Sequence, residues 1–364
     1  MKLLYFGAYN LHYPRNSTLR NGLMEHGWQI LICRCDININ PLIQNWFLLI
    51  NYLKLHQKNF NVIYLAERGQ NVAILAWVIS KITGKPLVVD FLYSRYDTQT
   101  EKKVVIKNSF SAKVLWILDW ISLHIGDLIV CDTKSHIEFY ANEFRLNPKK
   151  AIAIYLGADL NIYKPTAAPL NSKTKIIFWG SYTPSHGVDT IIRTAKLTQC
   201  LNLEYVLIGY GPTYQNSIQL ANELSSGNIT FYPWMSQDEL ALFISQADIV
   251  IGAVGKTQKS MRSICFKEFQ GCAMKKPVIT AETPAIKEVF TDRKNIILCQ
   301  AANSFSLRDA IIELINDKNL TRKISDGGYN LILDYFSHIK VSGVLSNHLL
   351  ELLESGNDCK IEMS

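Results

Sequence analysis

FKEFQGCAMKKPVIT, residues 266–280, runs from a short segment of mixed charge through a Lys-Lys-Pro turn into an apolar, strand-like run. A helix, a turn and an apolar strand in this order form the repeating unit of an α/β protein. In both directions the chain repeats this unit, because short apolar runs alternate with longer amphipathic segments. The sequence therefore predicts the α/β class, with parallel doubly wound sheets.

Two series of such runs flank one segment without periodicity. We expect strands at KLLYFG, QILICRC, NVIYLAE, PLVVDFL, DLIVCD and AIAIYLG, and again at KIIFWG, EYVLIGYG, ITFYPW, DIVIGAV, PVITAET and IILCQ. KPTAAPLNSKT, residues 164–174, has the composition of a linker. At 364 residues the chain exceeds what one hydrophobic core usually supports. We therefore expect two Rossmann-like domains, residues 1–165 and 166–340, with an interdomain cleft at the carboxyl ends of their strands.

The bulk composition is that of an ordinary globular protein, with 48% hydrophobic and 19% charged residues. No run reaches the length of a membrane span, and the strand-like start KLLYFG predicts that there is no signal peptide. The eight cysteines form no C-x-x-C pair. This pattern favours reduced, mostly buried thiols in a cytosolic protein, and we expect no metal site.

Excess positive charge is confined to the first half of the chain. Residues 1–166 contain 19 Lys and Arg against 12 Asp and Glu, and the remainder contains 19 of each class, so the net charge of +7 belongs to the first half. This favours an anionic partner, either a phospholipid surface or a phosphate-bearing acceptor. An uneven scatter of solvated lysines explains the same count. No nucleic-acid partner is expected.

Two glycine motifs do not complete known nucleotide-binding patterns. GAVGKT, residues 252–257, ends like a phosphate-binding loop, but Val250 stands where that pattern needs its first glycine. GYGP, residues 209–212, lacks the third glycine and the later acidic residue of a dinucleotide fingerprint. Both are interpreted as turns after strands, which disfavours a nicotinamide-dependent oxidoreductase.

Two junctions suit a bound anion. In FWGSYTPSHGVDTII a strand ends at Gly180, and His186 with Gly187 opens a helix whose free N–H groups can face a diphosphate. His186 alone is more often a local hydrogen-bonding residue than a ligand contact. In KTQKSMRSICFK four cations gather where the next helix begins, which is unfavourable for the helix dipole unless an anion binds there. They are Lys256, Lys259, Arg262 and Lys267.

The same phrases resemble a known family. FKEFQGCAMKKPVITAETPAIKEVF, residues 266–290, resembles the donor-site segment of the family-4 (group 1) glycosyltransferases, which often reads K-x-F-E-A-x-A-x-G-K-P-V-I before T-P-A and a later Glu. GSYTPSHGVDTII resembles their G-R-x-x-x-K-G-x-x-x-L loop, and LGADLNIYKP resembles the G-x-D-x-x-x-F-x-P phrase that closes their N-terminal domain. The phrases keep one order from about residue 127 to residue 336, which is more specific than any single motif.

The resemblance implies a GT-B fold. Residues 1–165 would bind the acceptor, residues 166–340 would bind the nucleotide-sugar, and residues 341–364 would form a helix that crosses back toward the N-terminal domain. The implied reaction is a retaining hexosyl transfer without a metal ion or other cofactor, from a UDP or GDP sugar to a glycan or lipid-linked acceptor in polysaccharide biosynthesis. In such a reaction cations and helix N-termini must stabilise the leaving diphosphate.

The resemblance also assigns residues. Lys267 stands at the family's lysine and Arg262 at an arginine frequent in this sub-pattern, so both are expected at the pyrophosphate, with His186 as the third catalytic candidate. His186 and Ser181 replace the loop lysine and the loop arginine. Gln270 replaces the second glutamate of an E-x7-E pair and is expected at the ribose. The donor-nucleotide set is Gly180, Ser181, Gly187, Gly209, Gln270 and Thr283.

The first glutamate of that pair falls at Arg262, so the usual carboxylate contact to the donor sugar is not evident. A non-catalytic nucleotide- or glycan-binding relative with the same fold therefore remains an alternative. Glu268 is close in sequence, but two residues from Gln270 on a helix it faces another side.

For the acceptor, polar residues follow two strand ends of the first half. These candidates are Asn10, His12, Arg15, Asp90 and Tyr93. We expect a cytoplasmic protein with peripheral contact to the anionic inner face of a membrane.

Overall fold

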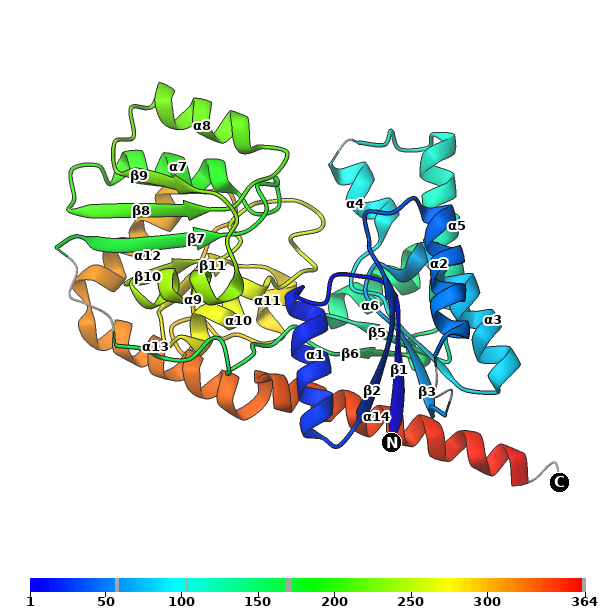
Figure 1. Cartoon of the computed structure of the whole chain (residues 1–364). Coiled ribbons are helices and arrows are strands. Elements are labelled where there is room, and N and C mark those ends of the chain that lie inside the picture. The colour runs from blue at the N-terminus through cyan, green and yellow to red at the C-terminus, as the bar shows by residue number, and fades with distance from the viewer. Residues whose placement is uncertain (56–58, 103, 168–171, 362–364) are drawn as a thin grey trace. The chain divides into compact units, whose positions relative to one another are not determined.

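The computed structural model describes residues 1–55, 59–102, 104–167 and 172–361. The chain forms two compact units (Figure 1). Unit 1 contains Met1–Tyr155 together with the C-terminal helix that begins at His338, and unit 2 contains Leu156–Ser337. In the part of the chain that the structure describes, no helix is both long and apolar enough to span a lipid bilayer.

Unit 1 is built on a parallel six-stranded sheet of order β2-β1-β3-β4-β5-β6. Its strands are β1 (Lys2–Ala8), β2 (Gln29–Cys35), β3 (Val62–Leu65), β4 (Leu87–Asp90), β5 (Leu128–Cys131) and β6 (Ala151–Ala153). Its helices are α1 (Pro14–Glu25), α2 (Pro41–Leu53), η1 (Gly69–Val72), α3 (Ala73–Thr83), α4 (Arg95–Glu101), α5 (Phe110–Ile125), α6 (Lys134–Phe144), η2 (Pro148–Lys150) and α14 (His338–Ile361). Every residue of β3 and β4 is buried, as expected for parallel strands covered by helices on both faces.

Unit 2 repeats the architecture with the order β12-β11-β10-β7-β8-β9. Its strands are β7 (Thr174–Trp179), β8 (Leu203–Ile208), β9 (Ile229–Tyr232), β10 (Ile249–Ile251), β11 (Val278–Ala281) and β12 (Ile297–Cys299). Its helices are α7 (Val188–Leu197), α8 (Tyr214–Glu223), α9 (Gln237–Ser245), α10 (Phe266–Ala273), α11 (Pro284–Lys287), α12 (Ser304–Asn316), α13 (Lys318–Leu331) and the π-helical turn η3 (Ile332–Phe336). Each apolar run expected as a strand is one, so the Rossmann-like fold class is confirmed.

The change of unit falls between Tyr155 and Leu156, earlier than the position expected at residue 165. The residues just after it are fixed in unit 2. Ala158 N donates to Phe336 O at 2.9 Å, and Tyr163 is buried with its hydroxyl 3.5 Å from Gln237 Oε1. Of the linker-like segment at 164–174, residues 168–171 lie outside the described residues.

Both sheets change winding direction at one position, where the crossovers leave in opposite directions along the sheet. In unit 1 this switch lies between β1 and β3, and in unit 2 between β7 and β10. The carboxyl ends of the two strands at a switch point are where doubly wound sheets bind ligands. The segments after β1, β3, β7 and β10 are therefore the first places to look for function.

Candidate functional site

In unit 2, Gly180 follows β7 directly and has a φ of +146°, a backbone conformation that favours glycine. A Cβ atom at this position would lie 3.2 Å from the imidazole Nδ1 of His186 and 3.3 Å from Nζ of Lys267. The glycine therefore leaves room for an imidazole and an ammonium group at the end of β7. Three of the residues expected from the sequence meet at this point: Gly180 and His186 of the loop after β7, and Lys267 from a distant part of the chain.

Lys267 lies in the first turn of α10 and is 3% exposed. Among the described residues its Nζ has no hydrogen-bond acceptor, and it lies 4.8 Å from the centre of the Phe178 ring. An ammonium group buried without a partner is costly, and an aromatic face compensates only part of that cost. An anion at the end of β7 would stabilise this charge.

Two helices begin at the same place. α7 starts after Gly187, and α10 starts after Cys265; neither has a side chain that caps its first N–H groups. His186 Nε2 lies 3.6 Å from Cys265 Sγ, so the imidazole stands beside the start of α10. Uncapped helix N-termini present N–H donors and partial positive charge, which suit phosphate oxygens.

The glycines of this region are explained by close backbone approach. A Cβ atom on Gly187, where φ is +68°, would lie 2.5 Å from Gly255 N, and one on Gly255 would lie 2.1 Å from Pro184 O. A Cβ atom on Gly209, where φ is +126°, would lie 2.1 Å from Gly180 O. Gly255, the second glycine of GAVGKT, thus packs against the loop after β7, in agreement with the interpretation of this motif as a turn.

Gln270 does not face an open site. It is 3% exposed, its Oε1 accepts a hydrogen bond of 2.9 Å from Trp179 Nε1, and its side chain also bonds to the Tyr163 hydroxyl. An amide both accepts and donates, so it can satisfy the buried indole N–H and a phenol together. The ribose contact expected of Gln270 stays a prediction.

Glu268 faces away from Gln270, as expected from the helix spacing. Its side chain is fully buried, and Oε1 accepts hydrogen bonds of 2.8 Å from Ala253 N and from Thr280 Oγ1. These bonds tie α10 to the ends of β10 and β11. Glu268 Oε1 is thus a structural acceptor at the sheet edge, whereas among the described residues its Oε2 has no partner.

The remaining donor candidates take different positions. Ser181 is exposed next to Gly180. Arg262 is partly exposed in the segment before α10, where its backbone N–H donates a hydrogen bond of 3.0 Å to Lys259 O. Thr283 is buried and accepts at Oγ1 from Ile286 N at 3.2 Å as the N-cap of the four-residue α11. This capping bond uses one lone pair of the Thr283 hydroxyl and leaves its O–H able to donate, so the expected phosphate contact stays a prediction.

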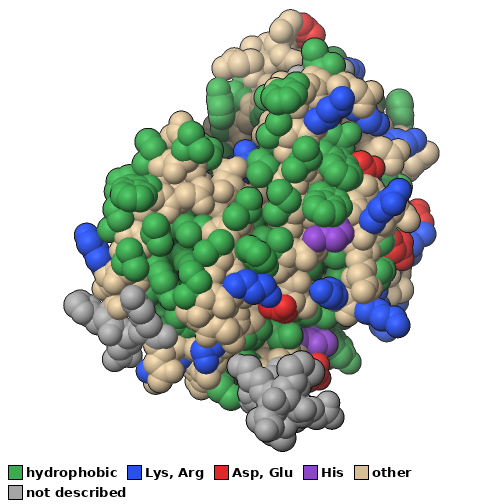
Figure 2. Space-filling model, turned by 90° about the vertical axis from the view of Figure 1, so that its right-hand side faces the viewer, with side chains coloured by type: hydrophobic (Ala, Val, Ile, Leu, Met, Phe, Trp, Pro, Cys, Tyr) green, Lys and Arg blue, Asp and Glu red, His purple; other side chains and the backbone are tan. Residues whose placement is uncertain are grey.

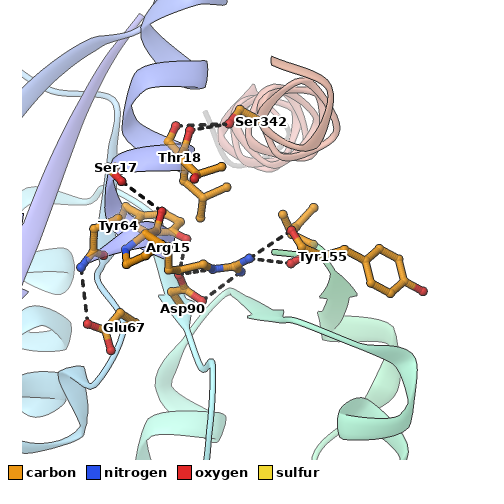
Figure 3. A network of polar contacts seen from close by, with 12 residues as sticks. Arg15, Ser17, Thr18, Tyr64, Glu67, Asp90, Tyr155 and Ser342 are labelled. Carbon is orange, nitrogen blue, oxygen red and sulfur yellow. Dashed lines mark hydrogen bonds and ion pairs between the residues drawn. The ribbon is translucent and has the colours of Figure 1, made fainter. Parts of the chain in front are cut away.

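In unit 1, Arg15 and Asp90 form a buried pair (Figure 3). Arg15 Nε and Nη2 lie 3.0 and 3.2 Å from the two carboxylate oxygens, Nη1 donates to Ile154 O at 2.6 Å, and Tyr64 donates to Asp90 Oδ2 at 2.8 Å. Burial alone would lower the pKa of Arg15, but the neighbouring Asp90 and other groups outweigh burial and raise it, so the guanidinium stays charged. Both residues are buried, and their contacts join α1 to the ends of β4 and β6. The acceptor role expected of Arg15 and Asp90 stays a prediction.

A residue that the sequence analysis missed lies at the switch point of unit 1. Glu67 follows β3 and is 2% exposed; its Oε1 accepts from Asn16 Nδ2 at 3.4 Å, and among the described residues its Oε2 has no partner (Figure 3). Burial raises the pKa of this carboxyl to about 7, although the neighbouring Arg68 opposes the shift. The only sequence signal was an acidic residue at the end of the strand-like run NVIYLAE.

Polar and aromatic groups surround this carboxyl, and we call Glu67, Arg68, Gln70, Tyr13 and Tyr93 the Glu67 cluster. The charge of Glu67 acts on both tyrosines, whose pKa values are raised chiefly by burial. Gln70 Nε2 donates to Tyr93 O at 3.0 Å, and among the described residues Gln70 Oε1 has no partner. Unit 1 therefore contains two buried, unused acceptor oxygens at its switch point, which suit the hydroxyl groups of a ligand.

Of the acceptor candidates, only Tyr93 is a member of the Glu67 cluster. Asn10 and His12 are exposed in the loop after β1, where Asn10 Oδ1 accepts from His12 N at 2.9 Å. Asn10 O also accepts from Asn16 Nδ2 at 2.9 Å, which links the loop to Glu67 through one amide. Within the described ranges no group of three His, Cys, Asp or Glu side chains is placed to hold a metal ion.

Residues 163–331 match the family model described as "Glycosyl transferases group 1", which confirms the resemblance found in the sequence. Among curated proteins, the chain is 25% identical over 226 residues to an uncharacterized glycosyltransferase of Methanocaldococcus jannaschii, an alignment that covers 62% of this chain and 59% of the relative. It is 24% identical over 224 residues to the lipopolysaccharide core biosynthesis glycosyltransferase LpsD of Rhizobium meliloti, covering 61% and 59%. The matched region thus spans about three fifths of these relatives.

Solved structures share the fold over nearly the whole chain. Sucrose-phosphate synthase from Thermosynechococcus elongatus superposes with a TM-score of 0.74 at 13% identity, covering 98% of this chain and all of that one. HepE of Anabaena, solved in complex with UDP, superposes with a TM-score of 0.69 at 14% identity, covering 96% of this chain and 100% of its own. The fold is therefore GT-B, as expected from the sequence.

Proposed function

We propose, from the membership of residues 163–331 in the group 1 glycosyltransferase family, that this protein transfers a sugar from a nucleoside diphosphate donor to a glycan or lipid-linked acceptor. The observation that carries the proposal is the buried ammonium group of Lys267, which has no acceptor among the described residues and lies beside His186 at the end of β7. The diphosphate of the donor is the anion that this site would take.

The geometry of unit 2 supports a role in bond cleavage. When the bond between the sugar and the phosphate breaks, negative charge grows on the leaving diphosphate. Lys267 Nζ and the uncapped N-termini of α7 and α10 supply fixed positive charge and donors. Groups that meet growing charge in a dry site stabilise the transition state more than the ground state. Arg262, in the segment before α10, is proposed as a second cation for the same diphosphate.

The finer features of the reaction belong to the same proposal. We assign a retaining, metal-independent hexosyl transfer in polysaccharide biosynthesis, carried out in the cytoplasm. The name of LpsD, which places that relative in lipopolysaccharide core synthesis, supports a glycan acceptor. The complexes of HepE with UDP and with UDP-glucose favour UDP over GDP in the donor.

For the acceptor we propose the Glu67 cluster. A carboxyl with a raised pKa can accept a hydrogen bond from a hydroxyl group and share its proton near neutral pH. Arg68 adjoins it, and Arg95 interacts electrostatically with both Arg68 and Tyr93. A sugar hydroxyl next to a phosphate group would match this combination of carboxyl, cations and aromatic rings.

Thermal unfolding in the presence of UDP, GDP and ADP tests the donor site. A ligand present at a hundred times its dissociation constant stabilises the folded state by about 2.7 kcal/mol, which raises the midpoint by a few degrees. We expect UDP to give the largest shift. If none of the three nucleotides raises the midpoint, the proposed donor site is wrong.

One observation favours a second candidate function, a non-catalytic nucleotide- or glycan-binding protein. Arg262 stands where the family has a carboxylate, and Gln270 is bonded to Trp179 and Tyr163. Incubation with UDP-glucose and release of UDP, measured with and without an oligosaccharide acceptor, separates the two. Stabilisation by UDP without any UDP release would support the binding protein.

A further inference from the structure

Helix α5 exposes large apolar side chains to water. Phe110, Val114, Ile117 and Trp120 follow one another at helical spacing and are all exposed, with Phe110 at 81%. The buried side of the helix carries Ala112, Asp119, Ser122 and Leu123. A surface helix normally has the opposite arrangement, with large apolar residues inside and polar residues outside.

Helix α3 shows the same inversion. Its buried positions include Ala73, Ala76 and Ser80, whereas Ile74, Trp77, Val78 and Ile82 are exposed, Ile82 at 80%. Lys81 Nζ lies 5.9 Å from the centre of the Trp77 ring, so a cation stands among these apolar groups. A tryptophan with an adjacent lysine is typical of helices that lie at a membrane surface.

Helix α2 completes the surface. Leu42, Trp46 and Phe47 are exposed, Leu42 at 83% and Trp46 at 64%, while the polar Gln44 is buried and bonds to Ile37 O and Ile39 O. η1 contacts α2, α3 and α5, and α3 packs against α5, so the three helices adjoin. We call their exposed apolar side chains the apolar face. Figure 2 shows hydrophobic side chains spread over the side of the molecule on which these helices lie.

The segments that carry the apolar face contain few acidic residues, although Glu143 of the neighbouring α6 accepts a hydrogen bond of 3.2 Å from Trp116 Nε1 of α5. No Asp or Glu occurs in residues 37–66, 68–89 or 102–118, and Asp119 of α5 is buried. The same segments carry the exposed cations Lys54, Lys81, Lys107 and Lys113. Much of the excess positive charge of the first half of the chain therefore lies beside exposed tryptophans and aliphatic side chains.

We propose that the apolar face of α2, α3 and α5 docks on the surface of an anionic phospholipid bilayer. Apolar side chains would enter the region between headgroups and acyl chains, the tryptophans would lie at the interface, and the lysines would contact lipid phosphates. Contiguous apolar patches of this kind are rare on proteins that stay free in solution. A second copy of the chain is a poorer occupant, because it would bring the same lysines against one another.

A hollow lies at the border of the apolar face. Its volume is about 470 Å³, and it is lined by Phe110 and Val114 of the face, by Val105, and by Arg95. Arg95 donates a hydrogen bond to Asn71 Oδ1 and interacts with Arg68 of the cluster. The hollow thus offers apolar side chains and one guanidinium group to a lipid, beside the polar Gln99 and Ser111. The docking proposal goes beyond the transfer reaction and does not depend on it.

Co-sedimentation of the full chain with vesicles tests the docking. The vesicles are phosphatidylcholine alone, and phosphatidylcholine with about 30 mol % phosphatidylglycerol, a content that gives a clear negative surface potential. We expect binding to the anionic vesicles that is weakened but not abolished by salt, because apolar insertion adds to the charge attraction. No binding to anionic vesicles at low salt would overturn the proposal.

The test variant combines Trp46→Glu, Ile82→Glu and Phe110→Glu, one substitution on each helix. The control combines Leu242→Glu and Phe305→Glu in unit 2, where the two side chains are 62% and 56% exposed. We expect the triple variant to bind anionic vesicles at least about tenfold more weakly, and the control to bind as the unchanged chain does. Equal binding by all three proteins contradicts the docking face.

Folding of the triple variant is checked by circular dichroism, and the single substitutions serve if it does not fold. Light scattering after gel filtration tests for a second copy as the occupant. If the unchanged chain is a dimer that does not bind vesicles, and the triple variant is a monomer, then the apolar face binds a second copy of the chain and not a membrane. Nucleotide stabilisation is measured on the same proteins, so that failure of the donor site and failure of the docking face are distinguishable.

Discussion

At the scale of single residues, Lys267 gives the sharpest expectation. Its ammonium group is buried without an acceptor among the described residues, so replacement by methionine, of similar length, should leave the protein without nucleotide as stable as before or more stable. The same variant should lose a charge-assisted contact of about 1.5–3 kcal/mol to the diphosphate, which is roughly a 10- to 100-fold loss of UDP affinity. Calorimetric titration with UDP, together with the midpoint of the protein alone, measures both.

Lys275→Met is the matched control for Lys267→Met. Lys275 follows α10 and pairs at the surface with Asp326 at 2.8 Å, where its side chain is 47% exposed. Such pairs contribute about 1 kcal/mol or less to stability, so this variant should change neither the UDP affinity nor the midpoint by much. A Lys267→Met protein that unfolds early and still binds UDP as tightly as before would show that the ammonium group is structural.

Glu67 predicts a pH dependence of stability. Burial raises its pKa in the folded protein to about 7 from an ordinary value of 4.5, so the folded state holds the proton more tightly than the unfolded state does. Stability is therefore lost as pH rises from about 4.5 to about 7, by an amount on the order of 3 kcal/mol at full ionisation. Glu67→Gln removes this loss, and its midpoint should exceed that of the unchanged protein by more at pH 8 than at pH 5.

Glu138→Gln, on the exposed side of α6, controls for the loss of one negative charge. If the difference between Glu67→Gln and the unchanged protein is the same at both pH values, the carboxyl is not held in the buried state that the structure shows. The acceptor role of Glu67 is a separate matter. Transfer activity of Glu67→Gln with a fixed donor, compared at saturating and at low acceptor, reports whether the carboxyl acts on the acceptor.

At the scale of elements, the close contact between the ends of β7 and β8 depends on one glycine. Gly209 has a φ of +126°, and a Cβ atom there would lie 2.1 Å from Gly180 O. Gly209→Ala should cost about 1–3 kcal/mol from backbone strain alone and more from the clash. Gly180 also faces His186 and Lys267, so the substitution should lower the affinity for UDP as well as the stability of the protein. Chemical denaturation and UDP titration measure both.

Gly227→Ala is the control at the element scale, because a Cβ atom on Gly227 meets nothing within 4 Å. It should be tolerated, and UDP should bind as before. Equal tolerance of Gly209→Ala would mean that the ends of β7 and β8 can separate without harm to the site, contrary to the close packing described.

The strands could be predicted because each is an apolar run between polar segments, a signal that depends on neighbouring residues only. The expected strand ends include the segments of both candidate sites, and Gly180, His186 and Lys267 do come together, but the partners of the buried polar side chains could not be predicted. Arg15 and Asp90 are 75 positions apart, and nothing in either neighbourhood shows that they pair. The hydrogen bond between Gln270 and Trp179 could not be predicted either, because the partner of a buried polar group depends on three-dimensional packing. The inverted pattern of α5 was hidden too, since periodicity shows two faces of a helix without telling which is inside.

At the scale of the whole molecule, unit 1 is closed by the last helix of the chain. In α14, Val341, Leu345 and Leu349 are buried, and Trp28 Nε1 donates to Ser346 Oγ at 2.8 Å. α1 approaches this helix so closely that a Cβ atom on Gly22 would lie 2.2 Å from His338 O. Unit 1 therefore needs residues from both ends of the sequence, whereas unit 2 is one continuous segment.

A chain that ends at Ser337 should lose this closing helix and keep every residue of unit 2. Removal of three buried side chains and of the Trp28 hydrogen bond should destabilise unit 1 by several kcal/mol, since each large apolar residue contributes about 1.5–3 kcal/mol when buried. We expect its thermal transition to move down or disappear, while UDP still raises the transition of unit 2. Differential scanning calorimetry with and without UDP resolves the two transitions. A chain that ends at Ser355 keeps the buried residues Val341, Leu345 and Leu349 of α14 and should behave as the full chain. If UDP stabilises this chain but not the one that ends at Ser337, unit 2 cannot bind the nucleotide by itself.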